Sequence, residues 1–166
     1  DKVYKTIIPR TVRLGEAHEE TGFGKPEDKK KKNEFATRRV CESIRDLKTV
    51  GVIREDREKR IIELAAPMGG VCALIPSTNP TSTVMFKAII SVKGRNAVVA
   101  SPHPKAVKCT VEAMNVGAQA AEAAGAPQGL MSCLQNPTIE ATNELMKHKL
   151  VSVILATGST PMVKAA

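Results

Sequence analysis

The chain has 166 residues, enough for one domain with a substantial hydrophobic core. Apolar residues make up 42% of it, but only 2% are aromatic and none is Trp, so few side chains could stack on nucleic-acid bases. Nucleic-acid binding would rest on the net charge of +8 alone, and we do not expect it. No apolar run has the length of a membrane span, so we expect no membrane partner either.

The first part of the chain is predicted to be polar and only partly regular. Residues 1–32 favour loops, and the lysine run over 29–32 is interpreted as solvated surface. Apolar residues at helical spacing predict an amphipathic helix over 33–51. A charged turn over 54–57 and a strand over 60–65 are expected to follow.

From residue 67 onward, short apolar runs alternate with helical patterns. The predicted strands cover 70–75, 96–100, 130–134 and 151–156, and the predicted helices cover 80–93, 104–124, 138–148 and the segment from 160. Apolar strands that alternate with helices are typical of parallel strands covered on both faces. We therefore predict an α/β fold, in which residues 67–166 form a Rossmann-like open parallel sheet and residues 1–66 form an entry segment with a helix and a short strand.

The four cysteines do not form a metal site or an evident nucleophile. No two of them make a CxxC pair, and we expect reduced thiols and no bound metal. Cys72 and Cys133 fall within predicted apolar strands, whereas a nucleophilic thiolate needs a nearby cation or helix N-terminus. The chain starts at Asp1 and ends within a predicted helix, so we expect a piece of a longer protein whose nucleophile lies beyond Ala166.

Two proline-rich turns follow the first two strands of the predicted sheet. Ligands of open α/β sheets bind outside the carboxyl ends of the strands, so the polar residues of these turns are candidate ligand contacts. In the first turn, over 75–82, Asn79 could cap the next helix or donate its amide N–H to a developing oxyanion. The sequence alone favours the cap.

The second turn, over 101–104, places His103 between two prolines. His103 is either a surface residue or a contact to a ribose hydroxyl or phosphate. After the fourth strand, residues 157–160 could present Gly158 and Ser159 to a phosphate, or Ser159 could be an ordinary helix cap. The G-x-G-x-x-G fingerprint of dinucleotide-binding folds is absent.

Six short segments carry a family resemblance. They are Asn-Glu-Phe-Ala-Thr (33–37), Lys-Thr-Val-Gly-Val-Ile (48–53), Ile-Pro-Ser-Thr-Asn-Pro-Thr-Ser (75–82), Arg-Asn-Ala (95–97), Ser-Pro-His-Pro (101–104) and Ala-Thr-Gly (156–158). Together they resemble the CoA-acylating aldehyde dehydrogenases, a group of the aldehyde dehydrogenase superfamily. This group includes one half of the bifunctional aldehyde-alcohol dehydrogenases and enzymes of bacterial microcompartments.

The resemblance implies the chemistry of the complete enzyme. A cysteine thiolate attacks a short aldehyde, a hydride passes to NAD or NADP, and coenzyme A takes the acyl group. Asn79 matches the oxyanion-hole asparagine of the family. The implied cofactor-binding residues are Ile75, Pro76, Ser77 and Thr78 beside the cofactor, Ser101, His103 and Pro104 near the adenosine ribose, Asn136, Pro137 and Thr138 on the adenine side, and Thr157, Gly158 and Ser159 at the pyrophosphate.

The chain departs from the family in what it contains. From the resemblance we expect that these residues lack the family's catalytic domain, with its cysteine, and its oligomerisation segment. Ser159 stands where acylating members often have a second glycine. We therefore expect the cofactor-binding part of a homo-oligomeric enzyme, inactive alone, in the cytoplasm or inside a bacterial microcompartment. The alternative is a non-catalytic nucleotide-binding module.

Overall fold

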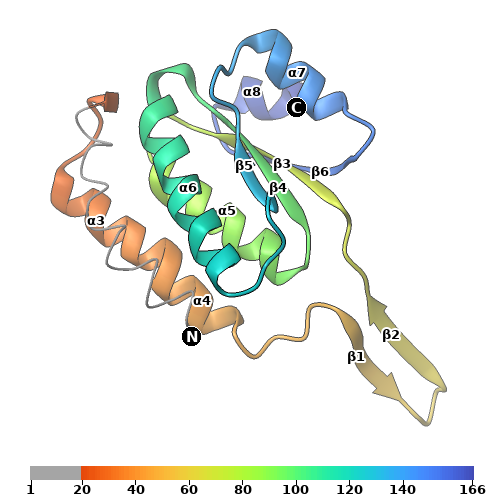
Figure 1. Ribbon diagram of the computed structural model, residues 1–166. Helices are drawn as coiled ribbons and strands as arrows, with labels where there is room; N and C mark the ends of the chain where they lie inside the picture. Colours follow the sequence, from red (N-terminus) through yellow and green to blue (C-terminus); the bar gives the residue numbers. More distant parts are fainter. Residues whose placement is uncertain (1–19) are drawn as a thin grey trace.

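The computed structural model describes residues 20–166, and residues 1–19 of the predicted entry segment lie outside this range. Its centre is a four-stranded parallel sheet with helices packed against it (Figure 1). A two-stranded hairpin projects from one end of this body.

The sheet has the strand order β5-β4-β3-β6. Its strands are β3 (Gly70–Ile75), β4 (Ala97–Pro102), β5 (Met131–Cys133) and β6 (Val151–Ala156), and all neighbours are parallel. From β3 the chain moves outward to β4 and β5, and then returns to the other side of β3 as β6. The direction of winding therefore reverses between β3 and β6. Open α/β sheets bind their ligands at such a switch point.

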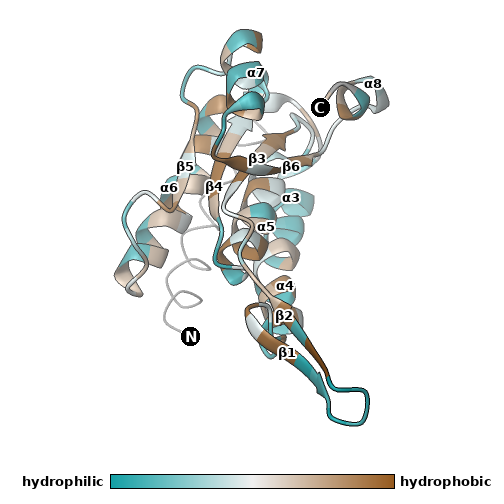
Figure 2. Ribbon diagram, turned by 90° about the vertical axis from the view of Figure 1, so that its right-hand side faces the viewer, coloured by the Kyte–Doolittle hydropathy of each residue, from teal (hydrophilic) through white to brown (hydrophobic). Residues whose placement is uncertain are grey.

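The helices that connect or follow the strands cover different parts of the sheet. They are α5 (Pro80–Lys93), the 3-10 turn η2 (Pro104–Ala106), α6 (Val107–Ala123), α7 (Ile139–Lys147) and α8 (Thr160–Ala165). Right-handed crossovers that run in opposite directions place their helices on opposite faces. Accordingly, α5 and α6 lie together, while α7 and α8 lie apart from them (Figures 1 and 2).

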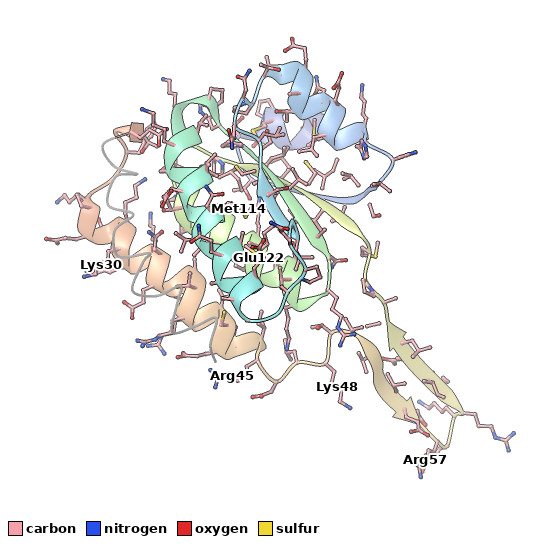
Figure 3. All side chains as sticks on the ribbon, in the orientation of Figure 1. Lys30, Arg45, Lys48, Arg57, Met114 and Glu122 are labelled. Carbon is pink, nitrogen blue, oxygen red and sulfur yellow. The ribbon has the colours of Figure 1, made fainter. Side chains whose placement is uncertain are left out.

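The hydrophobic core lies between the sheet and the pair α5 and α6. Alternate residues of β3, among them Val71 and Ala73, pack with Met85 of α5 and Met114 of α6. Figure 3 shows Met114 on the ribbon of α6 inside the molecule. Successive residues of a strand point to opposite faces of the sheet. Cys72, which lies between Val71 and Ala73, therefore points to the face opposite α5 and α6. The α/β fold predicted from the sequence is confirmed.

The entry segment differs from the prediction. One almost continuous helix is formed by α3 (Pro26–Glu34), the π-helical turn η1 (Phe35–Arg39) and α4 (Val40–Ile44), and it packs on α5. The loop predicted up to residue 32 is therefore wrong from Pro26 onward. Proline at the first helical position, acidic residues in the first turn and lysines in the last turn all favour this helix.

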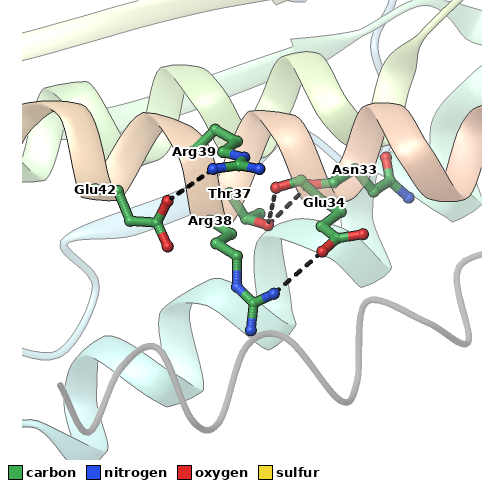
Figure 4. Close-up of polar contacts among 6 residues, drawn as sticks. All are labelled: Asn33, Glu34, Thr37, Arg38, Arg39 and Glu42. Atoms are coloured by element: carbon green, nitrogen blue, oxygen red, sulfur yellow. Dashed lines mark hydrogen bonds and ion pairs between the residues drawn. The ribbon is translucent and has the colours of Figure 1, made fainter.

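Figure 4 shows the polar contacts along this helix. Thr37 donates its hydroxyl to the carbonyl oxygens of Asn33 and Glu34, at 2.8 and 3.3 Å, across the wider π-helical turn. The side chains of Arg38 and Glu34 form an ion pair on the exposed side at 3.2 Å.

The boundary between the entry segment and the sheet domain, placed at residues 66 and 67, stays a prediction.

The hairpin contains one strand more than predicted. It consists of β1 (Gly51–Asp56) and β2 (Ile61–Ala65), so the charged turn expected over 54–57 is wrong. Arg54 lies opposite Glu63, and their side chains form an ion pair at 3.4 Å, which stabilises a charged strand pair. The strands expose apolar side chains, while the turn with Arg57 is hydrophilic (Figures 2 and 3).

Candidate functional site

Residues 76–79, here called the β3 turn, connect the carboxyl end of β3 to α5. Asn79 occupies the N-cap position of α5, but its side chain makes no capping hydrogen bond. Its Oδ1 instead accepts a hydrogen bond of 3.0 Å from Nζ of Lys32 on α3. The side-chain cap that the sequence favoured is therefore wrong, and the amide of Asn79 is oriented by a cation.

The lysine run of α3 contacts this turn, which the sequence interpretation missed. Lys29 is only 4% exposed, and its Nζ donates a 2.7 Å hydrogen bond to the carbonyl oxygen of Thr78. Desolvation lowers the pKa of Lys29; the neighbouring Cys109 opposes this change and Lys32 adds to it. Lys30 points away from the body of the protein (Figure 3). The prediction of solvated surface is thus wrong for Lys29.

A cleft of about 250 Å³ opens beside the carboxyl ends of β3 and β4. The predicted residues in its lining are Ile75, Ser101, His103, Pro104, Pro137 and Thr138. The other predicted residues lie outside this lining: Thr78 and Asn79 line a separate hollow with Lys29 and Lys32, and Pro76, Ser77, Asn136, Thr157, Gly158 and Ser159 line neither. Most of the cleft surface is apolar, which suits the flat face of an aromatic ring.

Three polar side chains of the cleft also hold local structure. Ser101 is buried, and its hydroxyl lies 2.7 Å from that of Thr142 on α7. His103 accepts a hydrogen bond from the Lys105 backbone N–H through Nδ1, which caps η2. Thr138 caps α7 by accepting from the backbone N–H of Ala141. For His103, the ring edge that carries Nε2 is therefore the part that can meet a ligand.

Residues 157–159, here called the β6 turn, connect the carboxyl end of β6 to α8. All three are exposed, and Ser159 makes no side-chain capping bond although it precedes α8. The interpretation of Ser159 as an ordinary helix cap is therefore wrong. A Cβ atom at Gly158 would lie 2.5 Å from the sulfur of Met162, so a larger residue there would displace that side chain.

A buried lysine joins the two strands that lead into these turns. Nζ of Lys87, on α5, donates to the carbonyl oxygens of Leu74 at 2.7 Å and Leu155 at 2.6 Å. These residues lie one position before the last residue of β3 and of β6. Desolvation lowers the pKa of Lys87 to about 8, against a smaller opposing effect of Cys72. No local sequence pattern indicates this contact.

Three of the four cysteines are poor nucleophiles. Burial raises the pKa of Cys72 to about 11 and that of Cys133 to about 12. The pKa of Cys109 rises to about 12, first because of burial and then because of Glu20. These thiols stay protonated at neutral pH.

Residues 20–166 contain neither a metal-binding cluster nor a membrane-spanning helix. No three His, Cys, Asp or Glu side chains in this range are grouped so that they could hold a metal ion. No helix in the same range combines the length and the apolar character needed to cross a bilayer.

The sequence model of the aldehyde dehydrogenase family matches residues 23–165. Together with the Rossmann-like sheet and the turns at its switch point, this match shows that the chain belongs to the aldehyde dehydrogenase family. A curated relative is the bifunctional aldehyde-alcohol dehydrogenase AdhE of Escherichia coli (strain K12), 47% identical over 147 residues. That alignment covers 89% of this chain and 16% of the relative.

Solved structures agree with this assignment. An acetylating aldehyde dehydrogenase from Geobacillus thermoglucosidasius is 58% identical, with a TM-score of 0.96 over 99% of this chain and 37% of its own. A propionaldehyde dehydrogenase from Rhodopseudomonas palustris, solved with bound CoA and an acylated cysteine, is 30% identical with a TM-score of 0.81. It is likewise covered over 37% of its length. The chain therefore spans little more than a third of the two solved enzymes, and 16% of the Escherichia coli relative.

Proposed function

We propose that this chain is the cofactor-binding part of an NAD(P)-dependent, CoA-acylating aldehyde dehydrogenase that converts a short aldehyde and coenzyme A to an acyl-CoA. The observation that carries the proposal is the position of the β3 and β6 turns on either side of the switch point. One of these turns presents Asn79, an amide that is not used as a helix cap.

The cleft beside β3 and β4 fits the adenosine end of a dinucleotide. Its apolar lining suits the faces of an adenine ring, and His103 can offer Nε2 to a ribose hydroxyl. The β6 turn offers exposed backbone and the unused hydroxyl of Ser159 to the pyrophosphate. A nicotinamide bound in this way supplies the acceptor for the hydride. The adenosine end of coenzyme A resembles that of the dinucleotide and could use the same contacts.

Asn79 is proposed to act on the aldehyde oxygen. When a thiolate adds to the aldehyde carbon, negative charge develops on that oxygen, and Nδ2 of Asn79 donates a hydrogen bond to it. The attacking cysteine is proposed to lie outside this chain. Cys72 and Cys109 are buried, Cys133 is partly buried, and all three have raised pKa values. Cys41 lines a different hollow from the one that contains Asn79. The acylated cysteine and bound CoA of the Rhodopseudomonas palustris structure support this chemistry.

The assembly and location are proposed on the family resemblance. We propose a homo-oligomer, which the exposed apolar residues of the hairpin support because they could be covered by another subunit. The proposed location is the cytoplasm, either free or inside a bacterial microcompartment. The aldehyde is proposed to be short, such as acetaldehyde or propionaldehyde.

The test is an assay of the complete enzyme with acetaldehyde or propionaldehyde, NAD or NADP, and coenzyme A. We expect NAD(P)H to form when aldehyde and coenzyme A are both present, and mass spectrometry to detect the acyl-CoA. A reaction without coenzyme A serves as the control. Dinucleotide binding without turnover under any of these conditions would support the alternative, a non-catalytic nucleotide-binding module, which no comparison favours.

A further inference from the structure

One face of α3 holds the β3 turn and the start of α5. Lys29 donates to the Thr78 carbonyl oxygen, Lys32 donates to Asn79 Oδ1, and Asn33 accepts 2.8 Å from the hydroxyl of Thr81 through its own Oδ1. The three bonds link residues that lie 47 to 49 positions apart in the chain. Positions 29, 32 and 33 share a helix face because they are three and four residues apart.

The chemistry of lysine determines which atom of Asn79 faces α3. A lysine ammonium group carries three donors and no acceptor, so only the oxygen of an asparagine amide can pair with it. The 3.0 Å contact between Lys32 Nζ and Asn79 Oδ1 therefore excludes the flipped amide. As a result, Nδ2 of Asn79, with its two donor hydrogens, is directed away from Lys32.

The backbone that carries Asn79 is held by the same helix. Lys29 is buried, and its hydrogen bond of 2.7 Å fixes the carbonyl group directly before Asn79. Lys29, Lys32, Thr78 and Asn79 line one hollow at the surface. Since backbone and side-chain amide are each held by a lysine, both the position and the orientation of the Asn79 amide depend on α3.

We propose that Lys32 is a positioning residue for the aldehyde oxidation, which fixes the Asn79 amide with Nδ2 toward the aldehyde oxygen. Lys29 supports this arrangement by holding the backbone of the turn. The inference rests on the proposed role of Asn79 in the reaction. Lys32 does not touch the substrate in this scheme, and its effect passes through Asn79.

The test compares variants of the complete enzyme. Lys32→Met removes the ammonium group and keeps most of the side-chain volume, so the Asn79 amide can rotate. We expect kcat to fall about tenfold, with the dissociation constant of the dinucleotide and the melting temperature unchanged, because Lys32 is exposed. Lys32→Arg should retain most of the rate, since a guanidinium also only donates. Lys31→Met, an exposed neighbour, is the matched control and should behave as wild type.

The double variant separates a positioning role from a merely structural one. If Lys32 acts through Asn79, adding Lys32→Met to Asn79→Ala should cause no further loss of kcat. Additive losses, or a wild-type kcat in Lys32→Met, would overturn the inference. If Lys32→Met lowers the melting temperature, the same comparison is made with Lys32→Gln. An Asn79→Ala variant with normal kcat would instead refute the oxyanion role on which the inference rests.

Discussion

The β3 turn and the start of α5 form three hydrogen bonds with side chains of α3, whereas the β6 turn is exposed and its serine makes no capping bond. Both turns follow neighbouring strands at the switch point. In the proposed enzyme, the β3 turn stabilises developing charge, which requires a fixed geometry before the reaction starts. The β6 turn contacts a cofactor that has to enter and leave. The difference indicates that rigidity is provided where charge develops.

The largest expected effect is that of Asn79→Ala in the complete enzyme. Removing the donor should lower kcat by roughly 10²-fold or more, while the dissociation constant of the dinucleotide changes little. Steady-state kinetics and a binding titration measure the two quantities. Asn115→Ala, on the exposed side of α6, is the control. A normal kcat would remove the proposed difference between the two turns.

Lys29→Met tests the support of the β3 turn. We expect the free energy of unfolding to fall by about 1–2 kcal/mol, because the Thr78 carbonyl loses a charge-assisted hydrogen bond. Chemical denaturation measures this change, and kcat should fall as well because the turn can move. Lys30→Met, at an exposed position of the same helix, should stay within about 0.5 kcal/mol of wild type. Equal behaviour of the two variants would contradict the support from α3.

Lys87 links the ends of β3 and β6, and it should make the free energy of unfolding depend on pH. Burial lowers its pKa to about 8 from 10.5, so between these values the unfolded chain holds a proton that the folded chain releases. The contribution of Lys87 to the free energy of unfolding therefore rises with pH across this window, by at most about 1.4 kcal/mol per pH unit.

The measurement compares wild type with Lys87→Met by denaturation at several pH values between 8 and 10.5. The free energy of unfolding of wild type should increase relative to that of Lys87→Met as the pH rises. The raised pKa values of Cys109 and Cys133 act in the opposite sense above pH 9, and they do so in both proteins. Lys87 lowers the pKa of Cys72, so its removal raises that pKa further and shifts the comparison in the same direction, in favour of wild type at high pH. A difference that does not change with pH would show that Lys87 is not held in the lowered-pKa state.

Ser159→Ala should have the smallest effect, and it tests the β6 turn in the comparison of the two turns. Because Ser159 makes no capping bond, the free energy of unfolding should change by less than about 0.5 kcal/mol. The dissociation constant of the dinucleotide should rise a few-fold, as expected for one lost hydrogen bond to the pyrophosphate. Ser43→Ala is the control, because Ser43 is an exposed serine of α4 that lines neither the cleft nor the hollow at Asn79. Unchanged binding would remove Ser159 from the proposed site.

The sheet was predictable because its signal is local. The apolar runs of β3 and β6 and the proline-initiated α5 have the bounds expected from the sequence, Gly70–Ile75, Val151–Ala156 and Pro80–Lys93. Each is defined by its own burial pattern and its own turn residues, so no distant contact is needed to recognise it.

The contacts that orient the candidate site were not predictable in this way. A lysine that reaches a carbonyl group 49 residues away has the same sequence signal as one in solvent, so the sequence predicts a surface position for Lys29. For Asn79 the residues alone favour a helix cap, because capping is the usual local role of an asparagine that precedes a helix. The charged run at the end of the strand Gly51–Asp56 favours a turn locally, and the partner that accommodates Arg54 in a strand is Glu63 on the facing strand.

The β1–β2 hairpin determines how these measurements should be made. Its two strands pair only with each other among residues 20–166, and Val52, Ile53, Ile61, Ile62 and Leu64 are exposed on them. Strand edges with unpaired backbone groups and apolar side chains readily pair with further copies. Variants should therefore be compared at one low protein concentration, where a change in light scattering would separate self-association from a change in folding.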